Sequence, residues 1–156
     1  MGRVMNVEFI PSNEDRLAEL KIQDVLLVDD DMFSIKLMKK CLNRIGCRTT
    51  AFTTPEDTLN SFIQGNLHFD AVVVDWNLQN MTGAELIQLI DFIIGPNSAL
   101  LESRDGRKVP VIIYSGSKNE PHFLPQTYNF YLVSCIDKMT NYRELRKITE
   151  SILRAG

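Results

Sequence analysis

The sequence predicts an α/β fold, a doubly wound five-stranded parallel sheet flanked by five helices. Short apolar segments of strand length alternate along the chain with segments whose apolar residues recur at helical spacing. Two of the apolar segments, residues 25–28 and 71–74, end abruptly in aspartate, as buried parallel strands with polar carboxyl ends do. The 156 residues, 44% hydrophobic and 24% charged, suffice for one such domain and are too few for two.

The first half of the chain supplies two strands and two helices. After the strand at 25–28, Ser34 is expected to cap a helix that Gly46 ends. The inner face of this helix carries Leu37, Met38, Cys41, Leu42 and Ile45. A threonine-rich strand follows over residues 47–53, and Thr54 with Pro55 then predicts the N-cap and first residue of a second helix. Its inner residues are Leu59, Phe62 and Ile63.

The middle of the chain supplies the third strand, the third helix and the fourth strand. The strand at 71–74 is followed by a helix from Gly83 to the Gly95-Pro96 pair, which ends it. Its inward residues are Leu86, Ile87, Ile90, Ile93 and Ile94. Residues 95–108 are polar and form a connection about ten residues longer than usual, and residues 109–115 resume as a strand.

The last part of the chain completes the alternation. Pro121 and Pro125 leave room for only a short or distorted fourth helix. Residues 132–136 make the fifth strand. Asn141 with Glu144 three residues later resembles a capping box that begins the fifth helix. This helix turns Tyr142, Leu145, Ile148, Ile152 and Leu153 inward.

Residues 24–156 are therefore expected to form the domain, and residues 1–23 an N-terminal extension. Within the extension, Ser12 is placed to cap a short helix that carries Leu17 and Leu20. Our hypothesis is that either the extension or the long connection at 95–108 forms a surface for a partner or for a second copy of the chain.

Composition excludes several classes of protein. Seventeen Lys and Arg against twenty Asp and Glu give a net charge of −3, without the basic excess that nucleic-acid binding needs. The cysteines Cys41, Cys47 and Cys135 lack zinc-ligand spacing and are expected to be buried thiols in a reducing compartment. No apolar run approaches the roughly 20 residues that span a bilayer, and the start of the chain lacks a signal-peptide pattern. We expect a cytoplasmic protein that binds neither nucleic acid nor membrane.

Polar residues follow four of the predicted strands, and the carboxyl ends of parallel strands share one edge of the sheet. They are Asp29 and Asp30 after the first strand, Asp75 after the third, Ser115 at the end of the fourth and Lys138 beyond the fifth. Three carboxylates this close repel one another unless cations lie among them. A divalent cation together with Lys138 would neutralise them, and oxygen ligands of this kind suit Mg²⁺, which commonly binds carboxylates together with phosphate oxygens.

Such a site predicts chemistry on a phosphoryl group. Asp75 can attack phosphorus while the metal and Lys138 neutralise charge on the phosphoryl oxygens. Ser115 is placed to donate a hydrogen bond to another oxygen, and Gly116 leaves room for the group to approach. Taken singly, these residues have simpler interpretations, since aspartates before a helix are often N-caps and lysines are usually solvated. Their joint placement at four strand ends favours the site.

The segments VLLVDDD, VVVDWNLQNMTG, VIIYSGS and IDKM, in this order, resemble the receiver domain of bacterial two-component response regulators, in particular single-domain, chemotaxis-regulator-like ones. The resemblance covers residues 24–154. It implies a flavodoxin-like sheet with strands in the order 2-1-3-4-5. It also implies that Asp75 accepts a phosphoryl group from the phosphohistidine of a sensor histidine kinase or histidine phosphotransfer protein. The output would be binding to a downstream protein or formation of a homodimer.

The resemblance also assigns roles within the site. It implies a Mg²⁺ site whose direct ligands are Asp30, Asp75 and the backbone carbonyl of Asn77. Asp29 would act on the metal largely through water, while Ser115 and Lys138 would contact the phosphoryl oxygens.

Several positions depart from the family pattern. Gln79 and Met139 stand where the family usually has proline. A cis peptide before a residue other than proline costs about 2.5–4 kcal/mol, so the Lys138–Met139 peptide is expected to be trans and to aim the lysine differently. Cys135 occupies the position of the usual aromatic switch residue, three before Lys138, which leaves Tyr131 as the only substitute. We expect an intact site with an altered readout surface.

Two other functions compete with the phosphoacceptor. The first is a pseudo-receiver that uses the fold as an unphosphorylated interaction module, and binding of a phosphoryl analogue with Mg²⁺ at Asp75 would distinguish it. The second is a phosphatase with an aspartyl-phosphate intermediate, similar to haloacid-dehalogenase-like enzymes. Such enzymes need a second Asp two residues after the nucleophile, and this chain has Asn77 there. We therefore expect no enzymatic activity beyond the protein's own phosphorylation and dephosphorylation.

Overall fold

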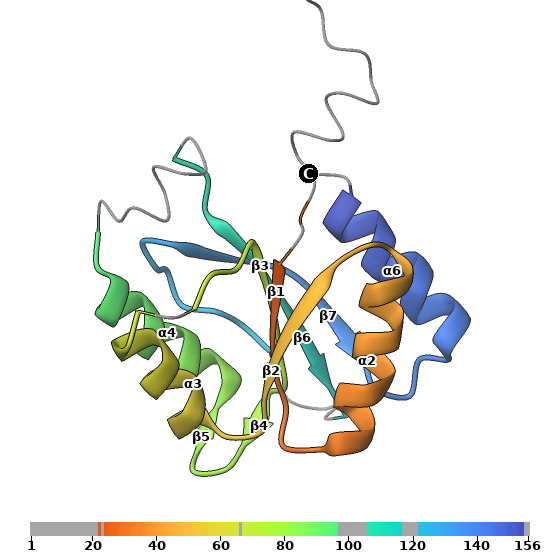
Figure 1. Ribbon diagram of the computed structural model, residues 1–156, viewed down its shortest axis with the longest axis horizontal. Coiled ribbons are helices and arrows are strands. Elements are labelled where there is room, and N and C mark those ends of the chain that lie inside the picture. The colour runs from red at the N-terminus through yellow and green to blue at the C-terminus, as the bar shows by residue number, and fades with distance from the viewer. Residues whose placement is uncertain (1–21, 23, 66, 97–105, 117–121, 155–156) are drawn as a thin grey trace, which may run out of the picture.

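The computed structural model of the protein describes residues 22, 24–65, 67–96, 106–116 and 122–154 (Figure 1). The strands are β1 (Asp24–Val28), β2 (Arg48–Phe52), β3 (Ala71–Val74), β4 (Asn77–Leu78), β5 (Met81–Thr82), β6 (Val109–Ser115) and β7 (Phe130–Asp137). The helices are α2 (Met32–Arg44), α3 (Pro55–Ile63), α4 (Gly83–Ile94) and α6 (Tyr142–Arg154).

Five strands form one parallel sheet in the order β2-β1-β3-β6-β7, and β4 and β5 form a separate antiparallel hairpin (Figure 1). Counted among the five parallel strands, this order is 2-1-3-4-5, so the predicted topology is confirmed. Val28 is in register with both Phe52 and Val74, so β1, β2 and β3 end at the same level. Residues that directly follow β1 and β3 are therefore neighbours in space.

Two hydrophobic clusters hold the helices to the two faces of the sheet. Helices α2 and α6 cover one face, and α3 and α4 cover the other (Figure 1). Buried residues on the α2 and α6 side include Leu27, Met38, Leu42, Tyr114 and Leu145. Those on the α3 and α4 side include Leu26, Phe69, Ile87, Ile90 and Phe130. The central strands contribute to both clusters because alternate side chains of a strand point to opposite faces.

The start of α2 corrects the prediction that Ser34 caps this helix. The N-cap is Asp31, whose carboxylate accepts hydrogen bonds from Phe33 N at 3.1 Å and from Ser34 Oγ at 2.7 Å. Ser34 is buried within the first turn. Carboxylates and hydroxyls are both good N-caps, and the aspartate comes first along the chain, so the helix begins before Ser34.

The other helix ends agree with the prediction. Thr54 caps α3 with Pro55 in its first turn, and α4 runs from Gly83 to the residue before Gly95. Asn141 accepts a hydrogen bond from Glu144 N at 3.0 Å at the start of α6. Ile63 and Ile93 were predicted to face inward, which is wrong, since both are exposed. In the last turn of α4 three consecutive apolar residues, Phe92 to Ile94, follow Asp91, so spacing alone could not indicate the covered side of this helix.

The described residues contain four helices where five were expected. Residues 122–127 hold no helix, and residues 117–121 of the same segment lie outside the described residues. The predictions for the extension at 1–23 and for most of the 95–108 connection also fall outside them. Across the described part of the chain, no helix has both the length and the apolar character needed to cross a membrane.

Strand β7 is longer than predicted and carries an irregularity. Val133 is an extra residue between the register pairs Val111↔Leu132 and Ile112↔Ser134, which makes a β-bulge. Cys135, in the second half of this strand, is exposed, so the expectation of a buried thiol holds for Cys41 and Cys47 only. β7 is an edge strand, and no described helix lies between β6 and β7 to cover it.

Candidate functional site

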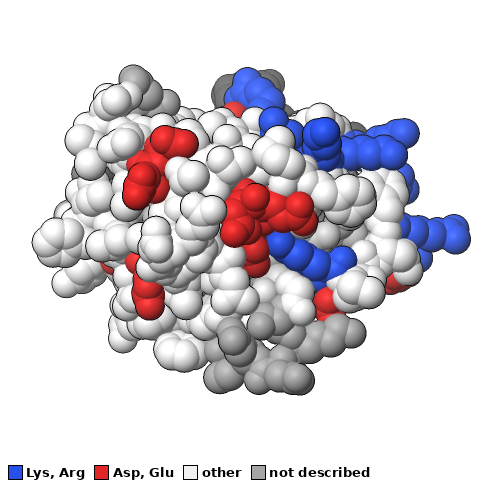
Figure 2. Space-filling view, turned by 90° about the horizontal axis from the view of Figure 1, so that it is seen from below, with Lys and Arg blue, Asp and Glu red and all other residues white. Residues whose placement is uncertain are grey.

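The predicted acidic residues meet at the carboxyl edge of the sheet. Asp29 and Asp30 directly follow β1, and Asp75 directly follows β3. Each offers one carboxylate oxygen, and these oxygens lie within 4.8 Å of one another. Figure 2 looks onto this edge and shows acidic side chains gathered beside a basic one. Asp29 and Asp75 are buried whereas Asp30 is exposed, so the cluster is held inside the protein on one side and open to solvent on the other.

Lys138 places a positive charge between two of these carboxylates. Its Nζ lies 2.9 Å from Asp29 Oδ2 and donates a hydrogen bond to Asp75 Oδ2 at 3.0 Å. Lys138 N donates to Ser115 O at 3.0 Å, which fixes the lysine backbone at the end of β6. The Lys138–Met139 peptide is trans, as the replacement of proline by Met139 predicts. With this trans peptide the ammonium group reaches both carboxylates, and the expected difference in its aim from the family pattern stays a prediction.

The surroundings of Lys138 keep it charged. Burial lowers the pKa of Lys138, but contacts with Asp29 and Asp75 outweigh this effect and raise it overall. The Tyr114 ring, fully buried, lies beneath the ammonium group at 5.8 Å from its centroid, within range of a cation–π contact. Sequence analysis missed Tyr114, although its place directly before Ser115 in the same strand pointed to this edge.

Asp29 has the most perturbed carboxylate of the site. Burial raises the pKa of Asp29 to about 6, and the charge of Asp75 adds to the increase, while Lys138 and the Asp31 backbone N–H oppose it. In contrast, the Ser34 hydroxyl and the Phe33 backbone N–H lower the pKa of Asp31, the helix N-cap. Because the pKa of Asp29 is raised despite its contact with Lys138, this one lysine does not compensate the negative charge at this edge of the sheet.

The cluster fits a hard divalent cation such as Mg²⁺. Three carboxylates are gathered beside one ammonium group, and Asp29 Oδ2 is a buried oxygen with no well-aligned hydrogen-bond donor among the described residues. Asp30 leaves one side of the cluster open to solvent, which suits a metal that keeps several of its waters. Direct ligation by Asp30, Asp75 and Asn77, with Asp29 acting through water, stays a prediction.

Ser115, Gly116 and Asn77 take their predicted places at the same edge. Ser115 is the buried last residue of β6, in register with Asp137. Among the described residues, a Cβ at Gly116 would meet nothing within 4 Å. Asn77 is exposed, two residues beyond Asp75, and pairs with Thr82 in the hairpin. Their contacts with a metal or a phosphoryl group stay predictions.

The β4–β5 hairpin, which sequence analysis missed, brings the start of α4 against Asp75. Gly83 N donates to Trp76 O at 2.8 Å. A Cβ at Gly83 would overlap the Asp75 carbonyl oxygen and lie 2.9 Å from Val74 Cγ2, so only glycine fits at this close approach. Thr82 and Glu85 form a capping box at the start of α4. That Thr-x-x-Glu spacing was the signal that could have revealed the anchored helix start.

An aromatic group lies next to Asp75. Trp76, directly after Asp75, is buried and packs against the rings of His122 and Phe123, with centroids 4.8 and 6.5 Å apart. His122 Nε2 is buried and has no hydrogen-bond partner among the residues that the structure describes. His122 and Phe123 thus cover the tryptophan that borders the site.

The two positions that the sequence analysis linked to the readout, Cys135 and Tyr131, both lie on β7. Cys135, three residues before Lys138, is an exposed thiol whose pKa is raised by burial of its sulfur. Tyr131 is in register with Pro110, near the opposite end of the β6–β7 pair from Ser115. Tyr131 is therefore too far along the strand to replace the aromatic switch residue.

A family model described as the response regulator receiver domain matches residues 25–150. The chain is also 24% identical, over 170 residues, to "Two-component response regulator ARR5" of Arabidopsis thaliana. This similarity covers 99% of the chain and 85% of that protein.

Solved structures of receiver domains share the fold. One is a CheY-like receiver domain from Methylobacillus flagellatus, with a TM-score of 0.59, 21% identity, and coverage of 84% of this chain and 98% of that one. Another is the BeF3-activated DrrB receiver domain, with a TM-score of 0.57, 21% identity, and coverage of 85% and 97%. The family match extends over nearly the whole described sheet, from β1 into α6. The chain therefore belongs to the response regulator receiver domain family.

Proposed function

We propose that this protein is a phosphoacceptor in two-component or phosphorelay signalling, and that Asp75 receives the phosphoryl group with the help of Mg²⁺. The observation that carries the proposal is the cluster of Asp29, Asp30 and Asp75 within 4.8 Å, with the Lys138 ammonium group against two of them. Buried acids gathered at a solvent-open strand edge are costly for stability, so their presence indicates a function.

The proposed reaction is an in-line displacement at phosphorus. A carboxylate oxygen of Asp75 forms the new O–P bond while the N–P bond of a donor phosphohistidine breaks, and the bonding electrons leave with the imidazole nitrogen. Bound Mg²⁺ supplies positive charge next to the phosphoryl oxygens. Lys138 already contacts Asp75 Oδ2 and supplies a second positive charge, and Ser115 ends the neighbouring strand, where its hydroxyl can donate to a phosphoryl oxygen.

The names of the similar proteins support this proposal. One relative is a two-component response regulator, and one similar structure is a receiver domain activated with BeF3, an analogue of a phosphoryl group. On this basis the donor is a sensor histidine kinase or a histidine phosphotransfer protein in the cytoplasm. The output is binding of a downstream protein, with self-association as one form of it.

Intact mass spectrometry tests the proposal. Wild-type protein with acetyl phosphate and Mg²⁺ should gain the mass of one phosphoryl group, and EDTA should prevent it. Asp75→Asn should gain nothing, while Asp57→Asn, which removes an exposed carboxylate on α3, should react like wild type. Absence of an adduct with acetyl phosphate, together with no binding of beryllofluoride, would favour the pseudo-receiver instead.

A further inference from the structure

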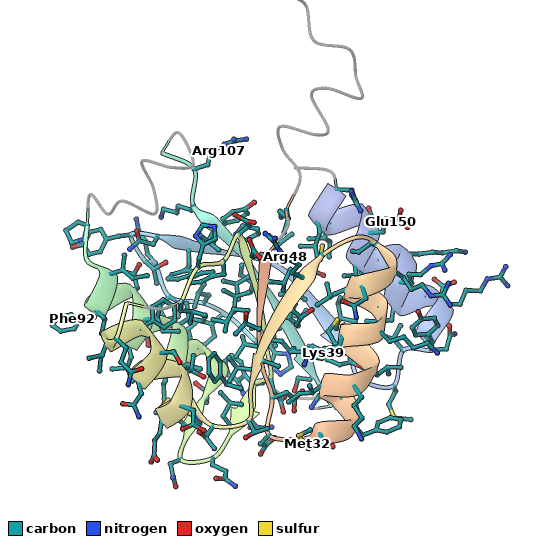
Figure 3. All side chains as sticks on the ribbon, in the orientation of Figure 1. Met32, Lys39, Arg48, Phe92, Arg107 and Glu150 are labelled. Atoms are coloured by element: carbon teal, nitrogen blue, oxygen red, sulfur yellow. The ribbon has the colours of Figure 1, made fainter. Side chains whose placement is uncertain are left out.

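The outer side of α4 is apolar although its inner side already packs on the sheet. The inner side carries the fully buried residues Leu86, Ile87 and Ile90. On the other side Leu89, Phe92 and Ile93 are spaced at i, i+3 and i+4 and are 42%, 84% and 42% exposed. Phe92 points away from the molecule (Figure 3). Large apolar side chains that lie exposed side by side often mark an interaction site, so this part of the outer side is a candidate contact surface.

The neighbouring helix extends this surface. Helix α3 lies beside α4 on the same face of the sheet (Figure 1), and its last residue, Ile63, is 70% exposed. On the other face of the sheet, α6 exposes no large apolar side chain, and α2 exposes Met32 and Phe33 in its first turn. We call the surface formed by Ile63, Leu89, Phe92 and Ile93 the α4 patch.

Both ends of α4 are fixed, which makes the patch rigid. At its start, Gly83 lies against Asp75 and donates to Trp76 O. Near its end, buried Asp91 accepts hydrogen bonds from the backbone N of Tyr128 at 2.9 Å and of Asn129 at 2.8 Å. Asn129 Nδ2 donates both to Asp91 and to Gly95 O, at 2.8 and 3.0 Å. A partner that binds this helix would therefore lose little free energy in ordering it.

The charges on the two helices of the patch indicate the chemistry of its partner. Helices α3 and α4 carry no Lys or Arg, and their exposed charged residues, Glu56, Asp57 and Glu85, lie in the first turns of these helices. Helices α2 and α6 on the opposite face carry eight cations and two acids. Figure 2 shows this separation, with Lys and Arg gathered on one side of the molecule. Two copies that met through this patch would bring like charges together, so the separation favours a basic partner over a second copy.

We propose that the α4 patch docks an amphipathic helix of a partner protein, in which apolar side chains are flanked by Lys and Arg. This surface is separate from the phosphoacceptor site and does not depend on the proposed phosphorylation.

Two synthetic peptides test the proposal on the full-length protein. The first is an amphipathic helix of about 18 residues built from Leu and Lys, a length that spans several helical turns. The second peptide has the same length, with Glu in place of every Lys. NMR shift changes on titration of the ¹⁵N-labelled protein with the Leu/Lys peptide should concentrate on α3 and α4. Phe92→Glu should weaken this binding about tenfold or more, as loss of a central apolar anchor does. The matched variant Phe33→Glu, at a similarly exposed phenylalanine on α2, should bind like wild type.

Several outcomes would overturn the proposal. Equal binding of the Leu/Lys peptide to wild type and Phe92→Glu would remove the apolar patch from the interaction. If the Leu/Glu peptide binds as tightly as the Leu/Lys peptide, the surface charge of α3 and α4 does not favour a basic partner. A dimer in analytical ultracentrifugation that Phe92→Glu dissociates would assign the patch to a second copy. Thermal unfolding of both variants checks that neither substitution at these exposed positions disturbs the fold.

Discussion

At the residue scale, the electrostatics of the site depend on Lys138. Its ammonium group is the charge that lies against buried Asp29 and Asp75, with only 18% of its side chain exposed. Lys138→Met keeps the length of the side chain and leaves the two carboxylates facing each other. Because an uncompensated buried charge is costly, we expect the free energy of unfolding at pH 7 without metal to fall by about 2–4 kcal/mol.

Urea denaturation in EDTA measures this loss. Lys147→Met is the matched control, since Lys147 is 64% exposed and its Nζ lies 3.7 Å from Glu144 on the surface of α6. Removal of that exposed pair should change stability by less than about 0.5 kcal/mol. Similar losses in the two variants would show that Lys138 does not compensate the acidic cluster.

A second prediction at this scale concerns the pH dependence that Asp29 contributes. Its pKa is raised from 3.8 to about 6 in the folded protein, mainly by burial. Between these values the folded state holds a proton that the unfolded chain has lost, so this group lowers the free energy of unfolding as pH rises from about 4 to about 6. Asp29→Asn lacks this contribution. Relative to wild type, the variant should therefore gain stability over that range, with little further change above about pH 7.

Urea unfolding in EDTA at a series of pH values tests the sign. Asp57→Asn serves as the control for loss of an exposed carboxylate. If the free energy of unfolding of wild type instead increases relative to that of Asp29→Asn as the pH rises, the pKa of Asp29 is not raised in the folded protein.

The sequence was sufficient to predict those site residues whose proximity follows from the strand order alone. Asp29, Asp75 and Lys138 each follow a strand, and parallel strands bring their carboxyl ends to one edge, so their proximity follows from strand order. Tyr114 contacts Lys138, and Trp76 contacts His122, through packing between distant segments of the chain. Such contacts depend on side-chain directions that no sequence spacing specifies, and they were missed.

At the element scale, Gly83 brings the start of α4 against the end of β3, directly before Asp75. A methyl group there would overlap the Asp75 carbonyl oxygen and press on Val74. Gly83→Ala should therefore destabilise the protein by about 1–3 kcal/mol, despite the better helix propensity of alanine. It should also slow acetyl phosphate-dependent labelling of Asp75, because the strand end must shift.

Gly116→Ala is the control for stability, because a Cβ at Gly116 meets no atom of the described residues within 4 Å. Thermal unfolding and the mass-spectrometric labelling rate are the two measurements. If Gly83→Ala unfolds at the temperature of wild type, the close approach of α4 to β3 is not a constraint on the fold.

The same scale explains which element predictions failed. Helix ends with strong local chemistry, such as Thr54 with Pro55, were placed from sequence because capping is a property of neighbouring residues. The covered side of α4 could not be predicted in the same way, because apolar residues occur on several sides of this helix. Only the tertiary structure decides that Ile90 is buried and Ile93 is exposed. The exposed side that contradicted the prediction is the one that forms the α4 patch.

At the scale of the whole molecule, the site joins parts of the chain that are distant in sequence. Asp30 follows β1, Asp75 follows β3 and Lys138 follows β7, so these groups come together only when the sheet has formed. An unfolded chain cannot present this arrangement. A cation bound there therefore stabilises the entire domain rather than one loop.

Mg²⁺ should consequently raise the free energy of unfolding of the whole domain, by about 2.7 kcal/mol when its free concentration is 100 times Kd. Trp76 is the only tryptophan of the chain and is adjacent to Asp75, so its fluorescence on titration with Mg²⁺ gives Kd directly. Urea unfolding at several Mg²⁺ concentrations then tests whether stability rises by the amount that this Kd requires. Asp75→Asn should lose most of the increase, whereas Asp57→Asn should keep it. Equal stabilisation of wild type and Asp75→Asn would place the bound cation outside the acidic edge of the sheet.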